Sequence, residues 1–161
     1  MSVCIVYHSE TGNTKKVAEA VAKATGAVLV PVRDLANYSK IGRYLVGARK
    51  ARAGGKSEIE PSEIDVSAYD LVVVGSPVWA WKPTPAANAA IAALTGCEGK
   101  KGMVLVTSGG TPGDTIAILK HALEARKMQV EGAFHFTDHE LDDEKKLKDF
   151  TDAVRKASRT P

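Results

Sequence analysis

Five apolar stretches recur along this chain, and a longer segment with helical spacing separates each from the next. Most of the stretches are unbroken apolar runs, which are typical of strands that are buried on both faces of a sheet. Strands with one face in water would alternate apolar and polar residues instead. The pattern predicts five strands: Val3 to Tyr7, Ala27 to Val32, Leu71 to Val74, Met103 to Val106 and Val130 to Phe136.

The intervening segments carry apolar residues three and four positions apart, as amphipathic helices do. Gly26 stands where a C-cap glycine belongs, and Thr111-Pro112-Gly113-Asp114 offers an N-cap Thr with Pro at N1 and Asp at N3. The predicted helices are Asn13 to Thr25, Tyr38 to Ala53, Thr84 to Leu94, Asp114 to Lys127 and Asp142 to Ala157.

Strict alternation of strands and helices predicts a parallel sheet, because right-handed crossovers place helices on both of its faces. We therefore expect an α/β fold, a three-layer αβα sandwich around a five-stranded parallel sheet. The chain has 161 residues, of which 44% are apolar and 25% charged, which suits a single globular domain spanning residues 1–161.

The segment Ser9-Glu10-Thr11-Gly12-Asn13-Thr14 joins the first predicted strand to the first predicted helix. Its hydroxyls, amide and backbone N–H groups would converge at the positive end of the helix dipole, where a phosphate binds without a lysine. It lacks the GxxxxGK[ST] of nucleotide triphosphatases and the GxGxxG of dinucleotide folds. We expect a phosphate monoester there; the alternative is that the segment only caps the helix.

Two further loops stand out, because ligands of such sheets lie beyond the carboxyl ends of the strands. The segment from Ser76 to Lys82 holds both tryptophans of the chain, Trp79 and Trp81. Exposed indoles favour a flat ligand, although one of them could instead pack beneath a neighbouring loop. The segment from Ser108 to Asp114 offers glycine-rich backbone, and its alternative role is a flexible connection.

These three loops resemble those of the flavodoxin family, and the resemblance covers essentially the whole chain. The family's phosphate loop, Ser/Thr-x-Thr-Gly-Asn-Thr, is matched from Ser9 to Thr14. The resemblance implies strand order 2-1-3-4-5, bound FMN, and electron transfer between redox partners. The implied cofactor residues are Ser9, Glu10, Thr11, Gly12, Asn13 and Thr14 at the phosphate; Ser76, Pro77, Val78, Trp79, Ala80, Trp81 and Lys82 along the ring; and Ser108, Gly109, Gly110, Thr111 and Gly113 at the pyrimidine edge.

The chain departs from familiar flavodoxins in its ring-binding loops. The third loop has no aromatic residue, so one ring face is expected to be open. Ala80 and Trp81 stand where many relatives have glycine, so we expect the one-electron-reduced flavin to be less favoured. Lys82 is placed to approach the flavin N1 and O2, or else to be a solvated lysine. These departures keep two alternatives open: an NAD(P)H-dependent quinone or FMN reductase, and a binding domain without redox function.

The charge distribution also differs from that of acidic flavodoxins, since the net charge is +3. From Arg33 to Lys56 there are seven basic residues against one acidic residue, Asp34. This basic segment is either a solvated helix face, or a dock for an acidic redox partner or for a phosphorylated substrate such as NADPH. Nucleic acid is disfavoured, because no aromatic residues or binding motif accompany the charge. We expect a monomer or weak dimer.

Other kinds of site find little support in the sequence. We expect no metal: His135 and His139 straddle a predicted strand end, where i, i+4 spacing does not bring side chains together. We also expect no catalytic side chain, because no nucleophile motif is visible. Cys4 and Cys97 lack disulfide or CxxC spacing, and no apolar run of 18 residues occurs, so we expect a cytoplasmic protein with no membrane association.

Overall fold

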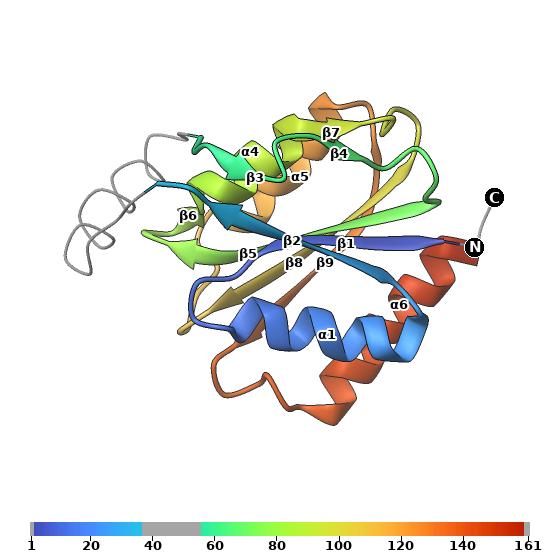
Figure 1. The fold of residues 1–161 in the computed structure, drawn as a ribbon. Helices are drawn as coiled ribbons and strands as arrows, with labels where there is room; N and C mark the ends of the chain where they lie inside the picture. The colour runs from blue at the N-terminus through green and yellow to red at the C-terminus, as the bar shows by residue number, and fades with distance from the viewer. Residues whose placement is uncertain (1, 37–55, 160–161) are drawn as a thin grey trace.

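The computed structural model describes residues 2–36 and 56–159 (Figure 1). The predicted helix Tyr38 to Ala53 lies outside these residues. The strands are β1 (Val3–His8), β2 (Val28–Asp34), β3 (Ile59–Glu60), β4 (Ile64–Asp65), β5 (Leu71–Trp79), β6 (Lys82–Pro83), β7 (Leu94–Thr95), β8 (Lys101–Ser108) and β9 (Gln129–Thr137); the helices are α1 (Asn13–Thr25), α4 (Pro85–Ala93), α5 (Thr115–Ala125) and α6 (Glu144–Arg159).

The five long strands form one parallel sheet in the order β2-β1-β5-β8-β9, which confirms the predicted order 2-1-3-4-5. Val6 of β1 pairs with Val30 of β2 on one side and with Val74 of β5 on the other. The short strands go beyond the prediction. β3 runs antiparallel along β2, β6 folds back antiparallel on β5, and β4 pairs with β7 apart from the main sheet.

Helices cover both faces of this sheet, with α1 and α6 on one side and α4 and α5 on the other (Figure 1). Successive residues of β1 enter opposite cores: Val6 belongs to the core that contains Leu119 of α5, and Ile5 to the core that contains Val17 of α1 and Phe150 of α6. This two-sided burial is the physical reason that the strands read as unbroken apolar runs. None of the helices in the described parts of the chain combines the length and hydropathy needed to cross a bilayer.

The central strand β5 is longer than predicted. It continues past Val74 because its neighbour β8 pairs with it as far as Pro77, and β6 then pairs with its last two residues through a tight hairpin. The prediction ended this strand at Val74, the last residue of the apolar run, and treated the residues from Gly75 onward as a loop.

Two predicted helix ends have different outcomes. Gly26 is the C-cap of α1, with φ 75°, as predicted. The predicted N-cap of α5 is wrong: the helix begins at Thr115 with Asp114 as its N-cap. Gly113 has φ 52°, a left-handed backbone that cannot continue into the first helical turn, so the Thr111-Pro112-Gly113 segment remains in the loop.

Gly75 of β5 lies where three elements meet. A Cβ added to it would lie 2.9 Å from the Cβ of Tyr7 in β1 and 3.1 Å from the Cγ2 of Thr14 in α1. We expect Gly75→Ala to lower the free energy of unfolding by about 1–3 kcal/mol, as overpacking of a fixed core does. Chemical denaturation measures this change.

Gly132→Ala in β9 is the matched control, because nothing lies within 4 Å of its added Cβ. Its free energy of unfolding should stay within about 0.5 kcal/mol of the parent value. If both variants unfold alike, the close approach of β1, α1 and β5 does not exist in solution.

Candidate cofactor site

The first loop, Ser9 to Thr14, leaves the C-terminal end of β1 and enters α1. Gly12 is the N-cap residue, with φ 94°, a left-handed conformation that glycine adopts at little cost. It brings no side chain to cap the helix. Gly12 itself therefore leaves the positive end of the α1 dipole uncovered, and Ser9 Oγ accepts one N–H of the first turn, that of Lys15. A helix N-terminus that its N-cap side chain does not cover suits an anion.

The three hydroxyls of the first loop do not share one direction. Ser9 Oγ accepts the backbone N–H of Lys15 at 3.1 Å, and Thr11 is exposed at the loop surface. Thr14 is buried, and its Oγ1 lies 2.8 Å from Oγ1 of Thr107 in β8. The structure thus brings Ser9 and Thr11 to the surface, while Thr14 fastens the start of α1 to the sheet.

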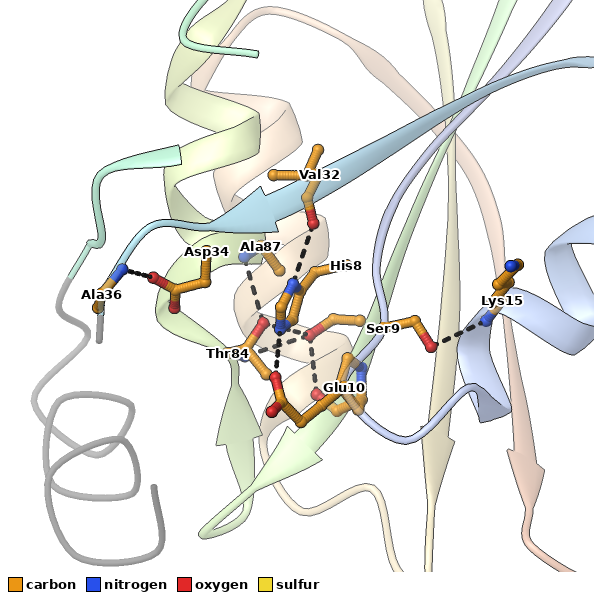
Figure 2. A network of polar contacts seen from close by, with 11 residues as sticks. His8, Ser9, Glu10, Lys15, Val32, Asp34, Ala36, Thr84 and Ala87 are labelled. Carbon is orange, nitrogen blue, oxygen red and sulfur yellow. Dashed lines mark hydrogen bonds and ion pairs between the residues drawn. The ribbon is translucent and has the colours of Figure 1, made fainter. Parts of the chain in front are cut away.

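His8, the last residue of β1, ties the first loop to its neighbours (Figure 2). Its side chain is buried, and Nδ1–H donates to the carbonyl oxygen of Val32 in β2 at 3.1 Å. Nε2 lies 3.6 Å from the carboxylate of Glu10. The imidazole ring also stands edge-on to the indole of Trp79, with 6.3 Å between the ring centroids. Glu10 therefore points toward His8 from within the first loop.

Ala80 and Trp81 form the two-residue turn of the β5–β6 hairpin. Their φ values are 48° and 65°, the left-handed backbone that a type I′ turn requires at both positions. Without glycine, this conformation costs roughly 1–2 kcal/mol per residue. The indole of Trp81 is 57% exposed, whereas Trp79 is half-buried. The hairpin therefore presents one large aromatic surface to solvent.

The third loop holds this strained turn in place. The N–H of Asp114 donates to the carbonyl oxygen of Trp81 at 2.9 Å, and Lys82 Nζ lies 3.2 Å from Asp114 Oδ2. Gly113 approaches so closely that a Cβ on it would lie 2.5 Å from the Cβ of Trp81. Only glycine fits there. The ion pair with Asp114 also means that the ammonium group of Lys82 already has a partner in this structure.

Ser76 is also among the predicted cofactor residues, but it is fully buried at the base of the hairpin. Its Oγ accepts the backbone N–H of Thr84 at 3.1 Å, and its O–H donates to the carbonyl oxygen of Pro77 at 2.8 Å. Thr84 in turn caps α4 by accepting the N–H of Ala87 at 3.2 Å. Ser76 thus joins the two ends of the β5–β6 hairpin through its hydrogen bond with Thr84. Pro77, Val78 and Trp79, which follow Ser76 in β5, are partly exposed.

The third loop begins at Ser108, whose hydroxyl contacts a histidine that sequence reasoning did not place in the site. Ser108 Oγ lies 2.7 Å from His135 Nε2 of the neighbouring strand β9, and the N–H of Gly110 donates to the same Oγ at 3.2 Å. Gly109, Gly110 and Thr111 are exposed. The N–H of Gly110 is used by Ser108, which leaves the exposed backbone of Gly109 and Thr111 for a ligand at this edge.

Asp138 joins the first loop to the third. Its N–H donates to the carbonyl oxygen of Ser108 at 3.0 Å, and its Oδ1 accepts the side-chain N–H of Asn13 at 2.9 Å. Sequence reasoning missed both Asp138 and His135 as site residues. The signal that could have found them is their place after β9, whose carboxyl end opens at the same edge as β8 in a parallel sheet.

The surroundings of His135 favour the neutral form of its ring. Burial lowers the pKa of His135 below its ordinary value, and the ammonium of Lys146 lowers it further, while the carboxylate of Glu140 opposes this. Lys146 Nζ lies 2.7 Å from Glu140 Oε2. The hydrogen bonds from Lys146 and from the N–H of Thr137 hold the pKa of Glu140 at about 2, so Glu140 stays ionised.

Within residues 2–36 and 56–159, no three His, Cys, Asp or Glu side chains gather closely enough to hold a metal ion. Both cysteines are buried thiols, and burial raises the pKa of Cys4 to about 11, which disfavours the reactive thiolate. The polar groups at the sheet edge are therefore suited to bind a ligand more than to attack it.

The edge fits the three parts of FMN. The phosphate suits the N-terminus of α1, where Gly12 brings no capping side chain and Ser9 occupies the N–H of Lys15. The flat ring suits the exposed indole of Trp81 and the partly exposed residues before it. The polar rim of the ring suits the exposed backbone of Gly109 and Thr111.

The strain at Ala80 gives a stability test of the hairpin. We expect Ala80→Gly to raise the free energy of unfolding by about 0.5–1 kcal/mol, because relief of the left-handed strain exceeds the added backbone entropy of glycine. Ala117→Gly, at an exposed helical position of α5, should instead lose about 1 kcal/mol. Chemical denaturation of both variants checks this. A loss at Ala80 equal to that at Ala117 would show that the turn is not left-handed.

Comparison with known proteins agrees with this fold and with FMN as the cofactor. A flavodoxin from Haemophilus influenzae is 30% identical over 77 residues, which cover 48% of this chain and 31% of that protein, about a third of its length. A flavoprotein in complex with FMN from Lactobacillus acidophilus is 22% identical, with 88% of this chain and 97% of that chain covered and a TM-score of 0.67.

The solution structure of two-electron-reduced Megasphaera elsdenii flavodoxin is 21% identical, with 96% and 98% of the two chains covered and a TM-score of 0.64. At these identities the solved structures establish the flavodoxin-like fold. The family model described as NADPH-dependent FMN reductase matches residues 1–157. The chain therefore belongs to the NADPH-dependent FMN reductase family, and it is an FMN-binding flavoprotein with the flavodoxin-like fold.

Proposed function

We propose that this protein is an oxidoreductase that takes electrons directly from NADPH onto bound FMN and passes them to an acceptor. The observation that carries the proposal is the third loop, which has no side chain larger than those of Thr111 and Pro112 between Ser108 and Asp114. A ring lying against the hairpin would be covered by Trp81 or Trp79 on one face only. The other face would be open to a nicotinamide, and membership of the reductase family supports this.

In this proposal the three loops have separate tasks. Ser9, Thr11, Gly12 and Asn13 bind the phosphate together with the first turn of α1, and Thr14 positions that turn through Thr107. The segment Pro77 to Lys82 lines the ring, and the segment Ser108 to Gly113 binds its pyrimidine side.

Bound FMN would supply the redox chemistry, by accepting a hydride and releasing electrons to an acceptor. The chain would supply binding and orientation. No lysine lies within the loop from Ser9 to Thr14. The positive end of the α1 dipole would therefore be what offsets the phosphate charge. The bonds from Asp114 to Trp81 and Lys82 keep the ring-binding surface in one arrangement before the cofactor arrives, which lowers the ordering cost of binding.

A second candidate is an electron carrier that exchanges electrons only with proteins. The match between the first loop and the flavodoxin phosphate loop favours it, as does the similarity to the Haemophilus influenzae flavodoxin. The basic segment Arg33 to Lys56 would be the dock for an acidic partner. Most of it lies outside the described residues; Arg33 itself pairs with Glu60 of β3.

A visible absorption spectrum separates these functions. The purified protein, saturated with FMN, is reduced anaerobically with NADPH and, in a separate cuvette, with dithionite. We expect the flavin absorbance to bleach with NADPH within the time of mixing and measurement. Bleaching with dithionite alone would reject the reductase and leave the carrier, and failure to bind FMN in excess would leave a binding domain without redox function.

The phosphate assignment is tested at Thr11, whose side chain is exposed in the first loop. Thr11→Ala should weaken FMN binding by about 5- to 150-fold, which corresponds to about 1–3 kcal/mol for one lost hydrogen bond to a charged group. Quenching of FMN fluorescence on titration measures the affinity. Thr25→Ala, at the far end of the same helix, is the control and should bind FMN as the parent does. Unchanged affinity in Thr11→Ala would remove this hydroxyl from the site.

A further inference from the structure

Ser108 and His135 form a contact that the proposed cofactor binding does not by itself require. Their side chains come from the adjacent strands β8 and β9, and Ser108 Oγ lies 2.7 Å from His135 Nε2. Ser108 is 8% exposed, and His135 is partly exposed, so the imidazole can exchange protons with solvent while the serine is shielded. The titratable ring of His135 is therefore connected to the third loop through the hydroxyl of Ser108.

The direction of the Ser108 hydrogen depends on the charge of His135. The N–H of Gly110 already donates to Ser108 Oγ. When His135 is neutral at Nε2, the single O–H of Ser108 donates to that nitrogen. When His135 is protonated, Nε2–H donates to Oγ instead, and the O–H must turn to another acceptor.

Among residues 2–36 and 56–159, two charged groups act on the titration of this histidine. Lys146 of α6 and Glu140 of the preceding loop are the charged groups that influence it, and they are bonded to each other at 2.7 Å. From β8 its neighbour is the uncharged Ser108. On α5, which also packs against β9, the buried residues are Thr115, Leu119 and Leu123, and none of them carries a charge.

We propose that His135 is a positioning residue that sets, through Ser108, whether the third loop offers a hydrogen-bond donor to the pyrimidine side of bound FMN. The inference rests on the proposed placement of the cofactor. Neutral His135 holds the serine hydrogen away from the ligand, and protonated His135 releases it toward the ligand.

This arrangement links reduction to proton uptake. A hydride from NADPH carries two electrons and one proton, so its transfer to FMN adds one negative charge to the cofactor, and NADPH leaves as NADP⁺. A negative charge beside Ser108 favours the state in which the serine donates, and that state requires one proton from solvent on His135. The net uptake is one hydride by the cofactor and one proton by the protein.

The test is the titration of His135 in three states of the protein: without FMN, with oxidised FMN, and with FMN reduced by dithionite. The chain has four histidines, so histidine-labelled protein gives few ring signals by NMR, and His135→Gln assigns the one that disappears. We expect the titration midpoint of His135 to rise by about one pH unit or more on reduction, the size expected for a nearby opposite charge.

Two variants distinguish the linkage from a structural role. His135→Gln keeps an acceptor near Ser108 but cannot titrate, and the reduction potential of its bound FMN should depend less on pH between about pH 5 and 8. Ser108→Ala keeps the titrating ring but cuts the connection, and it should abolish the rise of the midpoint on reduction. His121→Gln, an exposed position on α5, is the control and should leave the potential unchanged.

The possible results separate this inference from the proposed function. If FMN binds and NADPH reduces it, but the His135 midpoint does not move, the inference is overturned and the function stands. A midpoint that still rises in Ser108→Ala also overturns it, because the effect then acts through space. If FMN does not bind at all, both fall together.

Discussion

Burial of both faces of one parallel sheet is the constraint on which the rest of this structure depends. β1, β5 and β8 are apolar along nearly their whole length, so each must lie between two other strands and under helices on both sides. Parallel strands so enclosed have their carboxyl ends at a single edge. The polar residues that follow β1, β5 and β8 are therefore gathered there by the core. Some of them, such as Thr14 and Asp114, also fasten neighbouring elements to one another.

The sequence carries enough information for the sheet and for the three loops, because both depend on patterns within short segments. Unbroken apolar runs identified the strands, and the Ser9 to Thr14 segment predicts the phosphate loop. The contacts between loops were not predictable in this way. The hydrogen bond from Ser108 to His135 depends on how far two side chains reach between β8 and β9, and the left-handed turn at Ala80 and Trp81 opposes the local preference of both residues.

The site depends on oriented dipoles more than on charged side chains. The helix terminus at Gly12 and the exposed backbone of Gly109 and Thr111 provide the polarity, while Lys82 and Asp114 pair with each other. Dipoles fixed by backbone geometry do not titrate and need little rearrangement when the charge of a ligand changes. His135 is the exception, since it is partly exposed and responds to protons from solvent.

The close contact between Gly113 and Trp81 also has a consequence for how relatives of this protein can diverge. The second and third loops are far apart in sequence, but neither can change its backbone without the other, because a Cβ at Gly113 would overlap with Trp81. We therefore expect the two loops to vary together among relatives. Grafting either loop alone from another family member would disrupt both, whereas exchanging the pair could move a complete ring-binding surface between proteins.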